Sequence, residues 1–370
     1  MPSDSSNPLQ RLSELGQSVW IDFLSRESNR KGHLQKLIDE DSVVGATSNP
    51  SIFQKAMAGG DAYEEQLGEL AKEGLDIEEC FWALAEQDIR EACDLFAPSF
   101  EGSAHRDGYV SIEVDPRLAY DTLTTFREAM RLHEAIDKPN LMVKIPATKP
   151  GLGAIEDAIA KGRSINITLI FSLERYAEVA ESYVRGLERL IAEGGDPTKV
   201  ASVASFFVSR IDTEADRRLE EAGAKELQGK LAIANAKLAY EHYKQVFSGE
   251  RWEYLLSKGA TAQRVLWAST STKNPDYSDV LYVEELLGPD TVNTMPEETI
   301  NDYQDHGKPE ARLERDIEGA RRVLKEIDEV GVSYKDVTDT LEREGVEKFS
   351  AAFAELTAAL GEKRDSLVAA

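Results

Sequence analysis

The chain has 370 residues, 41% of them hydrophobic, and a formal net charge of −25. A chain of this length can bury a large core, as one domain or as two. The acidic charge argues against a nucleic-acid-binding protein, because such proteins neutralise phosphates with clustered Lys and Arg. No stretch approaches the roughly 20 apolar residues that span a bilayer, and the start lacks the pattern of a signal peptide. We therefore expect a cytoplasmic protein without membrane partners.

The cysteines and histidines give no indication of a metal centre or of a disulfide. Cys80 and Cys93 lie on one predicted helix, too far apart along it to bridge, and they form no CxxC pair. The five histidines lack the His-x-x-x-His spacing that places two ligands on one helix face. We therefore expect no metal site.

Short apolar runs alternate with longer stretches of helical periodicity along the chain, which is typical of a parallel sheet with crossover helices. The runs are residues 19–24, 44–49, 110–114, 141–147, 165–172, 202–209, 264–270 and 291–295. Eight such units can close into a ring. The sequence therefore predicts the α/β class and a (β/α)8 TIM barrel, with additional N- and C-terminal helices, as one catalytic domain over residues 1–370.

Three segments show the spacing of amphipathic helices. Apolar residues recur every three or four positions in residues 81–95, 173–191 and 346–360. The last of these would be a C-terminal helix that docks on the rest of the protein. Asp115 followed by Pro116 is typical of a helix start, so we expect a helix directly after the third strand. The longest irregular segments are expected at residues 98–108 and 273–279.

Side-chain parity brings polar residues together inside the predicted ring. Neighbouring side chains of a strand face opposite sides, so Lys144 faces inward while its apolar neighbours face the helices. The same alternation in residues 165–172 places Leu169 and Phe171 on the outer face. The predicted interior collects Asp22, Asn49, Glu113, Lys144, Asn166 and Thr168. A barrel core is ordinarily apolar, and isolated buried charges are costly, so this cluster near the strand ends indicates an active site.

Each of these residues also has a purely structural interpretation. Lys144 alone would most often be a structural lysine, here paired with Glu113. Asp22 could cap a helix, and a lone Thr168 would usually be a strand residue with a satisfied hydroxyl. Asn49 before a proline could simply form a turn. Their occurrence together favours a catalytic role for the group.

Three motifs in a fixed order resemble those of the transaldolase family, enzymes of the class I aldolase type. They are TSNPSIF at residues 47–53, MVKIPAT at residues 142–148 and INITLIFS at residues 165–172. A fourth, ASFFVSRID at residues 204–212, is similar to the family's phosphate-binding segment. The likeness covers most of the chain, and the enlarged second half resembles the longer bacterial subgroup.

The resemblance implies a sugar phosphate reaction without cofactor or metal. A dihydroxyacetone unit would pass reversibly from sedoheptulose 7-phosphate to glyceraldehyde 3-phosphate, in the pentose phosphate pathway. Lys144 matches the Schiff-base lysine, Asp22 the acid/base of the aldol step, and Glu113 with Thr168 the pair that handles a water molecule. Substrate-binding positions would be Asn49 and Asn166 for hydroxyls, Ser205 and Arg210 for phosphate, and Lys273 as a further cation.

Two other functions are compatible with the same barrel. A fructose-6-phosphate aldolase-like enzyme would release free dihydroxyacetone, but Glu113 and Phe207 favour transfer to an acceptor. A catalytically silent barrel that acts as a binding protein would be expected to lack the lysine or the acids, and all three are present here. The sequence leaves open whether the protein is a monomer or a homodimer.

Overall fold

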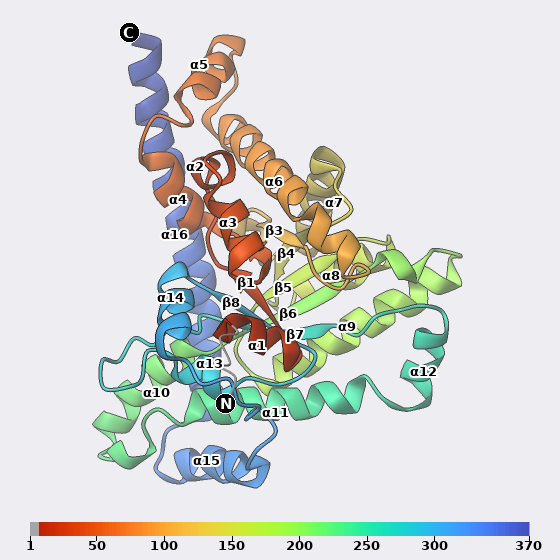
Figure 1. The fold of residues 1–370 in the computed structure, drawn as a ribbon, viewed down its shortest axis with the longest axis vertical. Coiled ribbons are helices and arrows are strands. Elements are labelled where there is room, and N and C mark those ends of the chain that lie inside the picture. The colour runs from red at the N-terminus through yellow and green to blue at the C-terminus, as the bar shows by residue number, and fades with distance from the viewer. Residues whose placement is uncertain (1–6, 370) are drawn as a thin grey trace, which may run out of the picture.

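A computed structural model describes residues 7–369, and its centre is a closed barrel of parallel strands (Figure 1). The strands follow one another around the ring in chain order, and the eighth pairs with the first. They are β1 (Gln17–Ile21), β2 (Val43–Thr47), β3 (Val110–Glu113), β4 (Leu141–Pro146), β5 (Ile165–Ile170), β6 (Ser202–Phe207), β7 (Arg264–Ala268) and β8 (Thr291–Met295). The predicted TIM barrel is confirmed, and every predicted strand overlaps an observed one.

Helices surround the barrel and extend beyond it. They are α1 (Pro8–Glu14), α2 (Arg26–Arg30), α3 (His33–Glu40), α4 (Pro50–Ala58), α5 (Glu64–Glu73), α6 (Ile77–Gly102), α7 (Thr122–Ile136), α8 (Gly151–Ala160), α9 (Leu173–Ala192), α10 (Ser209–Glu221), α11 (Leu231–Val246), α12 (Gly249–Ser257), α13 (Leu281–Glu285), α14 (Glu297–His306), α15 (Ile317–Glu329) and α16 (Tyr334–Ala369). The short 3-10 helices are η1 (Pro116–Leu118), η2 (Pro197–Lys199) and η3 (Lys225–Leu227). Helix α1 precedes the first strand, and α15 and α16 follow the last unit, which confirms the predicted additional helices at both ends.

Buried side chains fill the barrel interior toward the amino ends of the strands. Trp20 is completely buried, and a Cβ atom at Gly45 would lie 2.6 Å from its ring, so the glycine makes room for the indole. Near the amino ends of the strands, Arg264 donates to Ser18 at 2.7 Å and to Asp107 at 2.9 Å. This buried polar group borders a cavity of about 260 Å³ at the amino ends, whereas barrels of this kind carry their functional sites at the carboxyl ends of the strands.

The helices predicted at residues 81–95, 173–191 and 346–360 are confirmed as parts of α6, α9 and α16. The irregular segment expected at residues 98–108 is partly wrong, because α6 continues through Pro98 to Gly102. Phe100 is buried and its ring stacks on His105 at 4.2 Å, so tertiary packing extends the last turn. The irregular segment at residues 273–279 is confirmed.

The helix expected directly after β3 is only one 3-10 turn. The side chain of Asp115 accepts a hydrogen bond from the Arg117 amide, so the predicted cap forms. The turn then ends, and α7 begins at Thr122 with Asp121 as a second cap. Thr125 of α7 donates to the carbonyl of Leu118 at 2.7 Å, which ties the short turn to the longer helix.

Strand β5 departs from regular alternation immediately after Thr168. Its register with β6 shifts between Ile167 and Ile170, and Leu169 has a φ angle of 60°, in the left-handed region. Such a bulge redirects the side chains that follow it. Leu169 and Phe171 were expected on the outer face, but both pack beneath α16, where a Cβ atom at Gly345 would lie 3.0 Å from Leu169. The parity prediction therefore fails at this bulge.

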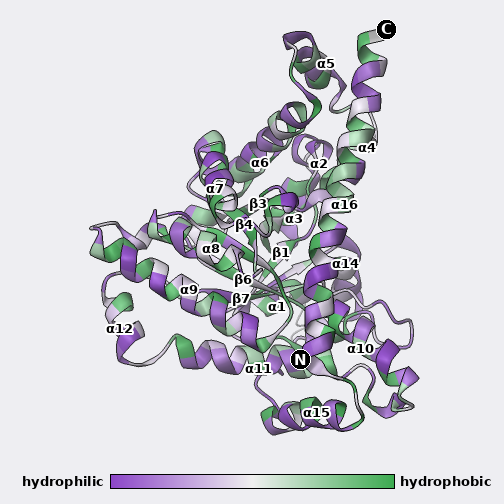
Figure 2. Ribbon diagram, turned by 180° about the vertical axis from the view of Figure 1, so that it is seen from behind, coloured by the Kyte–Doolittle hydropathy of each residue, from purple (hydrophilic) through white to green (hydrophobic). Residues whose placement is uncertain are grey.

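Helix α16 runs along much of the molecule and ends at the C-terminus (Figure 1). It contacts α10 near its start and both α4 and α5 further along. Figure 2 shows that apolar and polar residues alternate along it, whereas the strands at the centre are mostly apolar. Buried Phe349, Phe353, Leu356 and Leu360 form its apolar stripe. The C-terminal segment is thus part of the barrel's packing.

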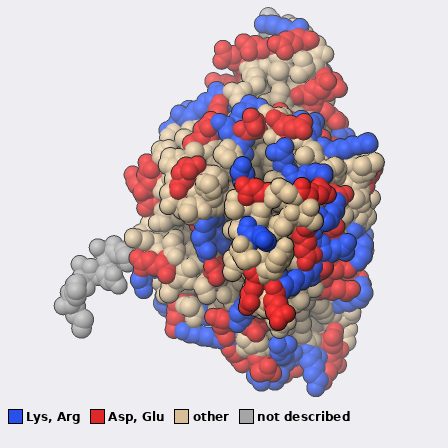
Figure 3. All heavy atoms as spheres, turned by 90° about the vertical axis from the view of Figure 1, so that its right-hand side faces the viewer, with Lys and Arg blue, Asp and Glu red and all other residues tan. Residues whose placement is uncertain are grey.

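The surface carries many charges of both signs. On the face shown in Figure 3, basic side chains are interspersed with acidic ones. Ion pairs join helices across the surface, as where Arg251 contacts Glu181 at 2.8 Å and Glu188 at 2.7 Å. Within residues 7–369, no helix has both the length and the apolar character needed to cross a membrane.

Candidate active site

A cavity of about 200 Å³ opens at the carboxyl ends of the barrel strands. Its lining residues are Asp22, Thr47, Asn49, Lys144, Thr168, Ser205, Phe207, Arg210, Ala268, Ser269, Ser271, Lys273, Thr294, Pro296 and Phe349. Almost all of them lie in, or just after, a barrel strand, and Phe349 comes from α16. The cavity brings together most of the residues that the sequence predicted for a site.

The amine of Lys144 lies inside this cavity and is largely shielded from solvent. The residue is 5% exposed, and its Nζ donates a hydrogen bond of 3.0 Å to the carbonyl of Ser48. The same Nζ is 3.7 Å from a carboxylate oxygen of Glu113, on the adjacent strand β3. The amine of Lys144 therefore contacts the segment directly after β2 and the side chain of Glu113 on β3, and the residue lines the cavity.

Asp22 lies directly after β1 and is held by hydroxyl groups of neighbouring strands. Thr47 donates to its carboxylate at 2.7 Å, and Thr47 also contacts the hydroxyl of Thr294 at 2.7 Å. Burial raises the pKa of Asp22, while the charges of Lys144 and Arg210 and the bond from Thr47 oppose that rise. A carboxyl group whose pKa is raised by burial can exchange a proton with a substrate more readily than a solvated aspartate.

Glu113 is the second buried acid of the site, and its pKa is also raised. Burial raises its pKa from 4.5 to about 7, although the nearby charge of Lys144 lowers it. Both of its carboxylate oxygens and the hydroxyl of Thr168 are buried without a hydrogen-bond partner among the described residues. Buried polar atoms are ordinarily hydrogen-bonded, so three such oxygens beside an amine indicate a functional position.

The two asparagines predicted to bind substrate, Asn49 and Asn166, lie at different depths. Asn49 lines the cavity and also caps α4, because its side chain accepts a bond from the amide of Ile52 at 3.1 Å. Asn166 is fully buried below the cavity, where it donates to Ser111 at 3.1 Å and accepts from Ser205 at 2.7 Å. Asn166 therefore does not line the cavity, but it orients Ser205, which does.

Two cations also line the cavity. Arg210 follows β6 at the start of α10, and Lys273 lies in the irregular segment after β7, where its Nζ donates to Ser271 at 2.7 Å. The backbone amide of Ser209 donates to the carbonyl of Ser269, which holds the start of α10 against the β7 segment. Arg and Lys with hydroxyl donors form a suitable binding site for a phosphate group.

Several residues of the lining were not predicted from the sequence. Ser269 has a φ angle of 58°, a strained conformation of the kind that concentrates at functional sites. Ser271, Thr294 and Pro296 lie where β7 and β8 end, so strand-end position was the available signal. Phe349 is contributed by a distant helix, and no local pattern could have assigned it to the site.

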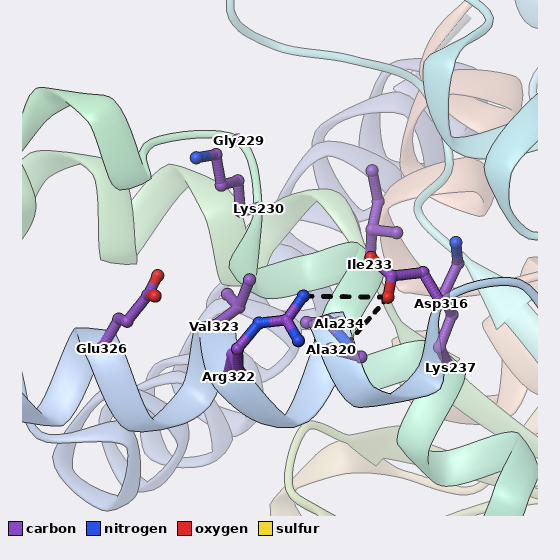
Figure 4. Close-up of a pocket in the computed structure, with 11 residues that line it drawn as sticks. Gly229, Lys230, Ile233, Ala234, Lys237, Asp316, Ala320, Arg322, Val323 and Glu326 are labelled. Carbon is purple, nitrogen blue, oxygen red and sulfur yellow. Dashed lines mark hydrogen bonds and ion pairs between the residues drawn. The ribbon is translucent and has the colours of Figure 1, made fainter.

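A larger cavity of about 400 Å³ lies between α11 and α15 (Figure 4). Two of its cations are already paired with acids, since Arg322 lies 3.9 Å from Asp316 of the same lining and Lys237 lies 3.2 Å from Glu285 outside it. Asp316 also caps α15 through the amide of Gly319. The groups that could perform chemistry converge in the smaller cavity at the strand ends. No cluster of three or more possible metal ligands occurs in the part of the chain described.

The fold and the cavity define a class of protein: barrel enzymes with an amine and two acids at the strand ends. The family model described as Transaldolase/Fructose-6-phosphate aldolase matches residues 19–360. The transaldolase of Parafrankia sp. (strain EAN1pec) is 51% identical over 365 residues, which cover 98% of this chain and 99% of that protein. The transaldolase of Mycobacterium marinum is 50% identical over 369 residues, with 98% and 99% covered.

The chain therefore belongs to the transaldolase/fructose-6-phosphate aldolase family. Identity of about one half over nearly the full length supports the function of a transaldolase, which is a transferase. The resemblance seen in the four sequence motifs is thereby confirmed.

Proposed function

We propose that this enzyme transfers a dihydroxyacetone unit from sedoheptulose 7-phosphate to glyceraldehyde 3-phosphate through a Schiff base on Lys144. The products are erythrose 4-phosphate and fructose 6-phosphate, and the reaction belongs to the pentose phosphate pathway in the cytoplasm. The observation that carries the proposal is the shielded amine of Lys144, which lies 3.7 Å from Glu113 and lines one cavity together with Asp22, Arg210 and Lys273.

The first steps join the donor to the enzyme. The neutral amine of Lys144 adds to the C2 carbonyl of the ketose, and the resulting carbinolamine loses its hydroxyl group as water. That loss requires a proton, which Glu113 supplies through a water molecule held with Thr168. The pKa of Glu113, at about 7, leaves a substantial protonated fraction at neutral pH, and the buried oxygens without protein partners support this role.

Asp22 performs the proton transfer of the carbon-carbon step. It takes the proton from the C4 hydroxyl while the bond between C3 and C4 breaks, and the electron pair moves into the protonated imine to give an enamine. The aldose product then leaves. The enamine attacks the aldehyde carbon of the acceptor, Asp22 returns the proton to the new hydroxyl, and hydrolysis of the imine frees the ketose. The hydrogen bond from Thr47 supports a fixed orientation of this carboxyl.

The phosphate end is anchored by the cations and hydroxyl groups of the cavity lining. Arg210 and Lys273 provide positive charge, and Ser205 and Ser271 provide hydroxyl groups in the same lining. Asn49 contacts substrate hydroxyls, and Asn166 acts by orienting Ser205. Anchoring one end at a fixed distance from the amine places the C2 carbonyl for attack.

Release of free dihydroxyacetone is the alternative outcome of the same intermediate. Transfer requires that the enamine persists until an acceptor arrives, so water must be kept from the imine. The ring of Phe207 lines the cavity and contacts Phe171 at a centroid distance of 5.1 Å, which supports an apolar wall beside the intermediate. We therefore favour transfer over hydrolysis.

The test measures turnover of fructose 6-phosphate with and without erythrose 4-phosphate. We expect release of glyceraldehyde 3-phosphate to depend on the acceptor. Lys144→Met should abolish it, whereas Lys149→Met, at an exposed lysine of the loop after β4, should not. Release of dihydroxyacetone at a comparable rate without acceptor would favour the aldolase alternative. Unchanged transfer by Lys144→Met would refute the proposed nucleophile.

A further inference from the structure

The guanidinium of Arg210 lies near the faces of two aromatic rings that come from distant parts of the chain. Its central carbon is 4.9 Å from the ring centroid of Phe207, at the end of β6, and 5.8 Å from that of Phe349, on α16. All three residues line the cavity. Within residues 7–369, no ion pair or hydrogen bond of the Arg210 side chain accompanies these two contacts, although acids are abundant in this chain.

Stacking of this kind orients a guanidinium without consuming its donors. A cation held over an aromatic ring face uses none of its N–H groups as hydrogen-bond donors, so those of Arg210 stay available to bind an anion. An arginine held by a carboxylate would instead have to exchange that partner for a phosphate group. An arginine side chain without such contacts would lose rotamer freedom on binding.

The position of Phe349 follows from a close approach of α16 to the barrel. Gly345 lies one helical turn before Phe349, on the same face of α16, and a Cβ atom at Gly345 would lie 3.0 Å from Leu169. The left-handed conformation of Leu169 turns its side chain toward α16 at this point. The helix is therefore seated directly on the end of β5, and the next turn places Phe349 over Arg210.

We propose that Phe349 is a positioning residue, through which the C-terminal helix forms the second wall of a clamp on Arg210 and sets the affinity for the phosphate end of the substrate. This inference rests on the proposed function, because it assumes that Arg210 binds phosphate. It assigns a role in the site to a segment that lies outside all eight strand and helix units of the barrel.

Phe353 provides a matched control for this role. It lies one turn further along α16, is equally buried, and also stacks under an arginine, with the central carbon of Arg117 at 4.9 Å from its ring centroid. Arg117, however, pairs with Asp115 and with Glu78 at 2.7 Å and does not line the cavity. Phe353 also contacts Phe81 and Trp82, at centroid distances of 5.2 and 6.2 Å, so Phe353→Leu removes at least as much packing as Phe349→Leu, but only the latter frees the guanidinium that lines the cavity.

The experiment measures the competitive inhibition constant of inorganic phosphate and the KM and kcat for fructose 6-phosphate. Phe349→Leu should raise the inhibition constant and the KM about tenfold with little change in kcat, and Phe349→Tyr should restore both. Phe353→Leu should lower the melting temperature at least as much as Phe349→Leu but leave the inhibition constant of phosphate unchanged. Borohydride trapping of the substrate adduct should persist in all three variants.

Three results would overturn the inference. They are an unchanged inhibition constant in Phe349→Leu, an equal rise in Phe353→Leu, and a failure of Phe349→Tyr to restore phosphate affinity. Loss of the borohydride adduct in the unmodified enzyme would instead refute the proposed function, so the two failures are distinguishable. Should Phe349→Leu not fold, Phe349→Met retains more of the side-chain volume and carries the same expectation.

Discussion

Replacing Glu113 with glutamine removes a buried charge while it keeps the shape of the side chain. The carboxyl group is 5% exposed, its oxygens have no hydrogen-bond partner among the described residues, and its pKa rises from 4.5 to about 7. Each pKa unit corresponds to about 1.4 kcal/mol. Ionisation of Glu113 in the folded enzyme therefore costs about 3 kcal/mol more than ionisation in the unfolded chain.

The sign of the effect on stability follows from proton binding. Below pH 4.5 the carboxyl is protonated in both states, and above about pH 7 it is ionised in both. Between these values the folded state retains the proton and the unfolded state releases it, so the free energy of unfolding falls as the pH rises. Over this window the unmodified enzyme should lose about 3 kcal/mol of stability relative to Glu113→Gln.

Urea unfolding at a series of pH values from 4.5 to 8 measures this difference. Glu226→Gln, at an exposed glutamate, serves as the control and should follow the unmodified enzyme. Glu113→Gln should also lower kcat by about 10²- to 10³-fold, because glutamine cannot supply the proton for dehydration. Parallel stability curves for Glu113→Gln and the unmodified enzyme would refute the electrostatic reasoning.

Three further changes test other parts of the structure. Asp22→Asn should lower kcat by about 10²-fold or more while the borohydride adduct still forms, and an unchanged kcat would exclude Asp22 as the base. Asp88→Asn breaks a buried ion pair of 2.7 Å with Arg26 and should cost about 3 kcal/mol in urea unfolding without changing KM; a shift in KM would show that this pair influences the site. Gly345→Ala crowds Leu169 and should raise KM for fructose 6-phosphate in steady-state assays, whereas a normal KM would show that α16 accommodates the methyl group.

Much of the site could be predicted because strand alternation and strand ends are visible in the sequence. Lys144 and Glu113 lie in regular strands, so parity alone placed both inside the barrel, and the register of β3 and β4 makes them neighbours. Asp22 lies just beyond a strand end, where parity still applies. Arg210 and Lys273 required the likeness to a known family, because loop and helix residues carry no such period.

The remaining features depend on tertiary contacts that no local pattern encodes. The bulge at Leu169 reverses the expected side-chain direction after Thr168, although the residues themselves are ordinary for a strand. Asn166 was correctly placed inward, but its depth below the cavity depends on bonds to Ser111 and Ser205. Phe349 reaches the site only because α16 crosses back over the end of β5.

The most direct test of the account is to locate the covalent intermediate. The enzyme is incubated with fructose 6-phosphate and sodium borohydride, digested, and examined by mass spectrometry for the added dihydroxyacetone or hexose phosphate mass. We expect one modified peptide, with the added mass on Lys144, and no modification in Lys144→Met. A stable adduct on another lysine, or none at all in an active enzyme, would contradict it.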